Sequence, residues 1–146
     1  MRIAAAPTTT SYPNPSPGLD LNRELGRVFE NSFYRSEAVS AVMASRRPLD
    51  DAAWAVRGVA SMENEFYALE TFRDLVKTKY TGRDLAYVGE ATGRSIDNDF
   101  YEHQALASFA KSGDRPSHDN VQRYAFLVGS NDNDFFAYQA VQEYFG

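Results

Sequence analysis

Apolar side chains recur along this chain at the same distances from four asparagines, Asn31, Asn64, Asn98 and Asn133. Counted from each asparagine, positions +3, +8, +11 and +12 are apolar and position +7 is small in every copy. This spacing follows the 3.6-residue period of an amphipathic helix, and a strand could not place these side chains on one face. The pattern predicts four helices that begin near the asparagines.

Each asparagine is the second residue of a near-copy of one pentapeptide, which begins with an acid and ends with two aromatic residues. The copies cover residues 30–34, 63–67, 97–101 and 132–136. Their asparagines stand 33, 34 and 35 residues apart, a period typical of helix-turn-helix repeats. The sequence therefore predicts an all-α fold of about four such repeats, either α-solenoid-like or a compact helical array.

Gly- and Pro-containing breakers separate the repeats, and no strand pattern is present in the sequence. The predicted helices cover residues 20–28, 32–45, 50–59, 62–79, 84–92, 96–111, 118–128 and 131–145. Residues 20–146 form one helical domain in this interpretation. Residues 1–19 hold four of the six prolines and predict an extended arm near polyproline II, with Tyr12 as a candidate anchor on a partner. A disordered end is the alternative for this segment.

Serines and glycines mark the predicted helix starts. Serines three residues before the later asparagines are expected to be N-caps; they are Ser61, Ser95 and Ser130. The acids that follow them would then lie in the first helical turn, where negative charge suits the helix dipole; they are Glu63, Asp97 and Asp132. A glycine upstream of each cap is expected to be the left-handed residue that ends the preceding helix; these glycines are Gly26, Gly58, Gly93 and Gly129.

The net charge and the absence of cysteine exclude several classes of partner and of chemistry. The formal net charge is −5, which argues against nucleic acid and anionic membranes as main partners. No apolar stretch is long enough to span a bilayer, so we expect no membrane insertion. The chain has no cysteine, which excludes disulfides, thiol nucleophiles, thiolate metal sites and thioether-linked cofactors.

Candidate catalytic chemistry is sparse. The Asp-Asn-Asp runs at 97–99 and 132–134 superficially resemble a calcium loop but lack its third oxygen ligand and its glycine, so helix capping is expected instead. His103 and His118 have no second ligand at helical spacing. We expect no metal site and no enzyme. The alternative, a helical enzyme or ligand-binding domain, would be signalled by a buried pocket with convergent polar groups.

The aromatic pairs that end the pentapeptides are the candidate partner surface. Adjacent helical residues diverge by about 100°, so both rings of a pair cannot face the core, and one is expected to meet the next repeat or a partner. A purely internal role is the alternative. The partner-contact candidates are Tyr34, Tyr67, Tyr101 and Phe136. The structural repeat signature is the four asparagines together with Phe33, Phe66, Phe100 and Phe135.

Arg46 and Arg47 form the one compact basic spot, at a predicted turn between repeats. Arginine pairs well with carboxylates, so this spot is a candidate docking point for an acidic partner. The alternative is a solvated loop without a partner.

The last repeat resembles units in the gamma subunits of red-algal phycoerythrin, which are linkers inside phycobilisome rods. The resemblance is carried by the segment Tyr124–Ser130, the acid-Asn-acid-aromatic element after it and the helix that ends at Tyr144 and Phe145. Gly93 to Ala110 looks similar, and Gly58 to Val76 more faintly, so the resemblance covers about residues 50–146. It implies a non-enzymatic linker or scaffold that organises a phycobilisome on the stromal face of the thylakoid in a plastid. Its partners would be phycobiliprotein hexamers or other linkers.

Gamma subunits carry bilins on cysteines, and this chain has none, so the resemblance implies a colourless scaffold whose aromatic residues contact bilins carried by partner subunits. The alternative is a general adaptor of the tetratricopeptide type in an intracellular soluble setting. That family has the same period, but its Trp, Leu-Gly and Tyr positions are not reproduced in the early helix of these units.

Overall fold

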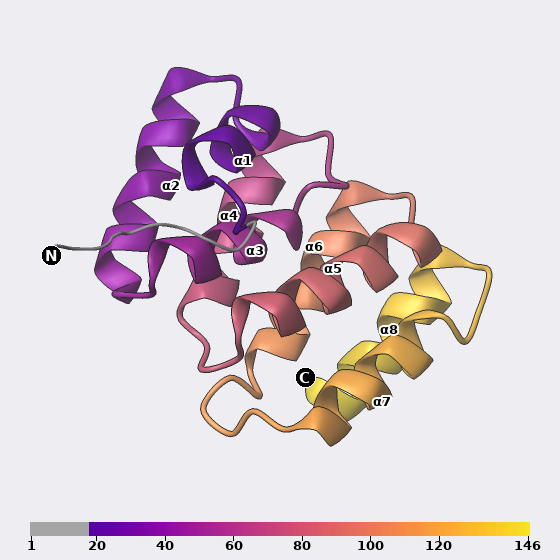
Figure 1. The fold of residues 1–146 in the computed structure, drawn as a ribbon. Coiled ribbons are helices and arrows are strands. Elements are labelled where there is room, and N and C mark those ends of the chain that lie inside the picture. The colour runs from indigo at the N-terminus through magenta and orange to yellow at the C-terminus, as the bar shows by residue number, and fades with distance from the viewer. Residues whose placement is uncertain (1–17) are drawn as a thin grey trace, which may run out of the picture.

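The computed structural model describes residues 18–146, and within that range the chain is all-helical, which confirms the predicted fold class (Figure 1). Tyr12 and most of the predicted arm lie outside the described residues. The eight helices of the described range are α1 (Leu21–Val28), α2 (Ser32–Ser45), α3 (Leu49–Arg57), α4 (Glu65–Val76), α5 (Gly82–Ser95), α6 (Asp99–Ala110), α7 (His118–Val128) and α8 (Asp134–Phe145).

The helices form two layers. Helices α1, α3, α5 and α7 lie side by side in one layer, and α2, α4, α6 and α8 lie side by side in the other (Figure 1). Each odd helix pairs with the next even helix as a hairpin. The hairpin connections, residues 29–31, 58–64, 96–98 and 129–133, therefore share one edge of the array, called here the hairpin edge. The connections at 46–48, 77–81 and 111–117 share the opposite edge, called here the linker edge.

Small residues allow the even helices to approach one another. Ala38, Thr71 and Ala105, the predicted small positions of the first three repeats, are fully buried in the even layer. Larger rings fill the space between the layers, where Phe109 lies with its ring centroid 4.6 Å from that of Tyr80 and 4.9 Å from that of Tyr124. One continuous core therefore runs through the stacked hairpins.

The prediction that glycines end the odd helices in left-handed conformation is wrong. Within residues 18–146 no glycine has a positive φ; Gly58 has φ −65° and Gly129 φ −93°, and Gly26 and Gly93 lie inside helices. Gly58 is needed for a different reason. A Cβ atom on Gly89 of α5 would lie 2.0 Å from the carbonyl oxygen of Gly58, so these two glycines bring the α3 and α5 backbones into contact.

The predicted serine N-caps are also wrong, because the even helices begin one residue after their asparagines. Ser95 ends α5, and Ser130 donates its hydroxyl to the carbonyl oxygen of Leu127 at 2.7 Å. The residue after Ser95 is Ile96, which is buried in extended conformation (φ −122°, ψ 118°), so the chain cannot be helical there. Glu63, Asp97 and Asp132 consequently precede their helices instead of lying in the first turn.

Candidate functional site

The asparagine of each pentapeptide fixes the start of an even helix. Its side-chain oxygen accepts a hydrogen bond from the backbone N–H three residues on, which satisfies one of the free amides at the helix start. Asn64 accepts from Tyr67 at 3.0 Å, and Asn98 accepts from Tyr101 at 3.0 Å. Asn31 and Asn133 cap α2 and α8 in the same way. Every aromatic pair is therefore held in a first helical turn.

The acid after the asparagine ties each repeat to the preceding one. Oδ2 of Asp99 accepts from the backbone amides of Glu63 at 3.0 Å and Asn64 at 2.7 Å. Asp134 makes the same pair of bonds to the amides of residues 97 and 98, and Glu65 accepts from the amide of residue 31. These carboxylates, called here the repeat clasps, hold the helix starts in register. The sequence signal for them is the acid at this position in every copy except the first, which has Ser32.

The aromatic pairs of the last three repeats join into one line of rings at the hairpin edge. Tyr67 contacts Phe100 edge-on, with centroids 5.9 Å apart, and Tyr101 contacts Phe135 edge-on at 5.8 Å. Within each pair the two rings are also in contact. We call this line the aromatic row, and its members are Phe66, Tyr67, Phe100, Tyr101, Phe135 and Phe136. Phe33 and Tyr34 form an equivalent pair at the start of α2.

The first ring of each pair faces outward. Phe33, Phe66, Phe100 and Phe135 are 66, 50, 45 and 42% exposed, whereas Tyr34, Tyr67 and Tyr101 are half-buried. The two rings of a pair are therefore not both in the core, and the outward ring is the phenylalanine of the repeat signature.

Two of the predicted contact tyrosines are held between repeats. Tyr67 stacks on the ring of His103 at 5.5 Å, and Tyr101 stacks on Tyr138 at 5.7 Å. Tyr34 is half-buried and packs against the core. Phe136, which takes the tyrosine place in the last copy, is 52% exposed because no described helix packs beyond α8.

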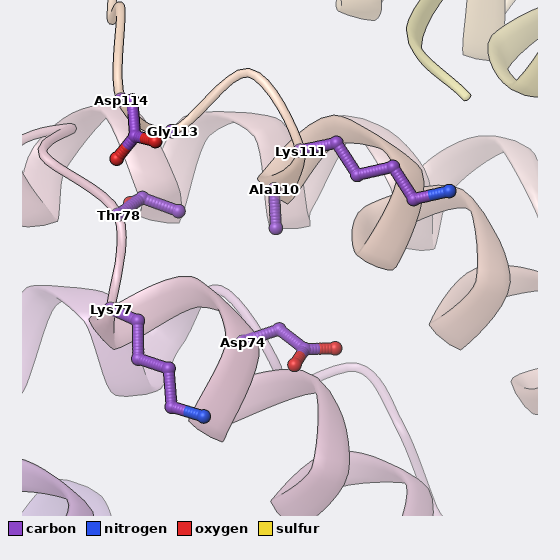
Figure 2. Close-up of a pocket in the computed structure, with 7 residues that line it drawn as sticks. All are labelled: Asp74, Lys77, Thr78, Ala110, Lys111, Gly113 and Asp114. Carbon is purple, nitrogen blue, oxygen red and sulfur yellow. The ribbon is translucent and has the colours of Figure 1, made fainter.

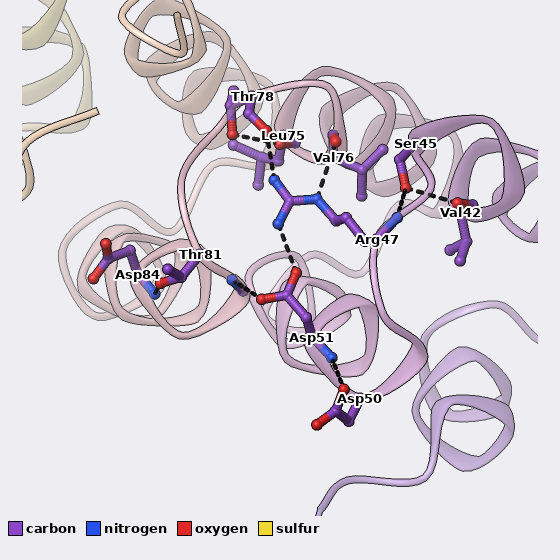
Figure 3. A network of polar contacts seen from close by, with 11 residues as sticks. Val42, Ser45, Arg47, Asp50, Asp51, Leu75, Val76, Thr78, Thr81 and Asp84 are labelled. Atoms are coloured by element: carbon purple, nitrogen blue, oxygen red, sulfur yellow. Dashed lines mark hydrogen bonds and ion pairs between the residues drawn. The ribbon is translucent and has the colours of Figure 1, made fainter. Parts of the chain in front are cut away.

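Arg47, one of our two basic contact candidates, is used inside the fold. Its guanidinium donates to the carbonyl oxygens of Val76 at 3.0 Å and Thr78 at 2.6 Å and pairs with Asp51 at 2.6 Å (Figure 3). The other carboxylate oxygen of Asp51 accepts from the Gly82 amide at 2.7 Å. With a side chain only 10% exposed, Arg47 joins two turns of the linker edge.

Arg46 is the exposed member of the basic spot. It is the C-cap of α2 and has a left-handed backbone with φ 61°. Of the predicted docking point, only this one guanidinium is accessible at the linker edge.

Two titratable side chains of α6 are hydrogen-bonded to residues of the preceding repeat. Nδ1 of His103 lies 2.7 Å from Oγ1 of Thr71, and burial lowers the pKa of this histidine. Glu102, the residue before His103, is buried and accepts a hydrogen bond from the Ser61 hydroxyl. Burial raises the pKa of Glu102 to about 7. His118 is exposed at the first position of α7. Within residues 18–146 no group of three or more His, Asp or Glu side chains is arranged to hold a metal ion.

A pocket of about 360 Å³ lies at the linker edge between the ends of α4 and α6 (Figure 2). Asp74, Lys77, Lys111 and Asp114 supply its charged side chains. Figure 2 shows that the ends of the Lys77 and Lys111 side chains lie apart, so their ammonium groups do not converge on one point. This arrangement is a charged surface hollow without the convergent polar groups of a small-molecule site.

None of the helices between residues 18 and 146 combines the length and the apolar character required to cross a bilayer. Comparison of the chain with family models, with curated proteins and with solved structures found no match.

Proposed function

We propose that this protein is a non-enzymatic scaffold that binds other proteins through the aromatic row at its hairpin edge. The observation that carries this proposal is the line of exposed phenylalanines, one from each of the last three repeats. Aromatic side chains supply much of the binding energy at protein interfaces, and rings held in place by the fold lose little entropy on binding. Here the asparagine caps and the repeat clasps fix each ring in a first helical turn.

The specific setting that we propose is a phycobilisome, in which the chain acts as a colourless linker or accessory scaffold in a plastid. The acid-Asn-acid-aromatic element that carries the resemblance to phycoerythrin gamma subunits is the element that builds the aromatic row. Phycobiliprotein hexamers or other linkers would be the partners. Lacking cysteine, the chain would contact bilins on its partners and carry none itself.

Co-sedimentation of the full chain with isolated phycobiliprotein hexamers, and separately with phycobilisome linkers, tests this setting. We expect binding that the variant F66A/F100A/F135A reduces at least about tenfold, because three ring contacts are lost. The matched control is M43A/L49A/Y87A, which removes three exposed apolar side chains away from the row. Loss of binding in the control variant, or full binding by the row variant, would contradict the role of the row.

The same surface supports a second candidate function, a general adaptor for a protein outside light harvesting. The observation that favours it is that the row is built from side chains alone and needs no pigment. Absence of binding to hexamers and linkers, combined with capture of a non-pigmented partner that depends on the row, would select this function.

A further inference from the structure

We infer that the aromatic row binds a basic polypeptide segment, one in which arginine or lysine alternates with apolar side chains. This inference rests on the proposed function and specifies the chemistry of its partner. It is carried by the exposed rings together with the charge that surrounds them.

Negative charge is concentrated around the row. The four pentapeptides contain seven acidic residues and no basic one, whereas all three lysines of the chain, Lys77, Lys79 and Lys111, lie at the linker edge. The arginine nearest the first pair, Arg35, donates to the carbonyl oxygens of Phe29 and Glu30. Arg57 pairs with Glu24 in the odd layer. The exposed Arg27 and Arg94 lie near the ends of α1 and α5 at the same edge. The seven acids of the pentapeptides outnumber these arginines, so the surface next to the exposed rings carries an excess of negative charge.

The two acids of each motif have different roles. The acid after the asparagine is a repeat clasp and is occupied by backbone amides. The acid before the asparagine is exposed in all four copies, and among residues 18–146 its carboxylate accepts no hydrogen bond and forms no ion pair; these acids are Glu30, Glu63, Asp97 and Asp132. Each repeat thus presents one accessible carboxylate and, three residues later, one exposed phenylalanine.

This regular combination determines what fits. Apolar side chains of the partner would contact the rings, and cationic side chains would pair with the carboxylates, which otherwise stay hydrated. Guanidinium groups can also lie against aromatic faces. A nucleic acid, an anionic membrane or an acidic segment would be repelled by the same carboxylates.

The test uses the full chain and a labelled peptide of about six Arg-Leu-Ala units, with binding followed by fluorescence anisotropy at two salt concentrations. Control peptides replace arginine with the neutral isostere citrulline or leucine with serine. We expect the citrulline peptide to bind at least about tenfold more weakly, and binding of the arginine peptide to fall as salt is raised. The serine peptide should also bind more weakly, because the ring contacts are lost.

The protein variants separate the charge from the rings. E63Q/D97N/D132N should weaken binding of the arginine peptide by about tenfold and flatten its salt dependence. The matched control, D84N/D114N/E143Q, removes three carboxylates away from the row and should change binding less than about twofold.

The outcomes distinguish this inference from the proposed function. Equal binding of the arginine and citrulline peptides, an unchanged affinity of the E63Q/D97N/D132N variant, or no binding of the arginine peptide at all would overturn the inference. If F66A/F100A/F135A still lost its protein partner in those cases, the aromatic row would stand as the binding surface with a different partner chemistry. If that variant kept its partner, the proposed function would fail as well.

Discussion

The carboxylate of Asp99 accepts a hydrogen bond from the backbone amide of Asn64 at 2.7 Å and so joins the start of α6 to the start of α4. The same oxygen accepts from the amide of Glu63 at 3.0 Å. Both amides precede α4 and have no partner within that helix. The side chain of Asn64 meanwhile caps its own helix, so one residue links the local cap to the contact between repeats.

Replacing Asp99 with alanine should lower the free energy of unfolding by about 1–3 kcal/mol, because two amides at the repeat junction lose a charged acceptor. The matched control is D97A. Asp97 lies two residues earlier, is exposed and accepts no hydrogen bond among the described residues, so its loss should cost less than about 0.5 kcal/mol. Urea denaturation measures both, and equal effects would contradict the clasp.

Gly89→Ala should destabilise the protein by at least about 1–3 kcal/mol, because its Cβ would meet the backbone of Gly58 and push α5 away from α3. The control is Gly26→Ala in α1, where a Cβ meets nothing within 4 Å. Alanine has the higher helix propensity, so that variant should gain up to about 1 kcal/mol. Thermal unfolding that shifted in the same direction for both variants would refute the close approach of the two helices.

The buried carboxyl of Glu102 should make stability depend on pH. Burial raises its pKa from 4.5 to about 7, and hydrogen bonding from Ser61 opposes this shift only in part, while Asp97 and Asp99 add to it. Between these two values the folded chain holds a proton that the unfolded chain has released. The stabilisation that comes from holding this proton is therefore fully present below pH 4.5 and is lost as pH rises through about 7.

Glu102→Gln stays uncharged and should remove this loss, so its stability relative to the parent chain should grow by up to roughly 3 kcal/mol between pH 4.5 and 8. The difference between the two proteins is the quantity to measure by urea denaturation, since the lowered pKa of His103 acts in the opposite direction in both. Glu63→Gln, at an exposed position of the same edge, is the control and should show no such trend. A constant difference across the pH range for E102Q would disprove the buried proton.

Local patterns predicted the helices well. The segments 32–45 and 118–128 match α2 and α7 at both ends, because apolar spacing and flanking breakers act within one helix. The helix starts at Glu65, Asp99 and Asp134 were placed about three residues too early. Both Ser and Asn are good N-caps, so the local sequence does not choose between them. In the third copy the burial of Ile96 in extended conformation prevents a helix start at Ser95.

The parts of the site that sequence reasoning missed depend on contacts between repeats. The clasp from Asp99 to Asn64 joins residues 35 positions apart, and no local preference reveals it. Which ring faces outward depends on the neighbouring helix, since Tyr67 is covered by His103 whereas Phe66 is not. Arg47 and its neighbour are indistinguishable in the sequence, yet only one of them reaches the carbonyl oxygens of the next turn.

The two adjacent arginines should respond in opposite directions to substitution. Arg47→Met removes a guanidinium that binds two carbonyl oxygens and Asp51, which leaves those groups without their donor in a part-buried turn. The expected cost is about 2–4 kcal/mol of unfolding free energy. Arg46→Gly relieves a left-handed backbone at φ 61° on an exposed residue and should be neutral or stabilise by up to about 1 kcal/mol. Chemical denaturation measures both variants. An R47M variant as stable as the parent chain would mean that the linker edge is held together without the Arg47 guanidinium. A destabilised R46G variant would mean that Arg46 makes a stabilising contact of its own.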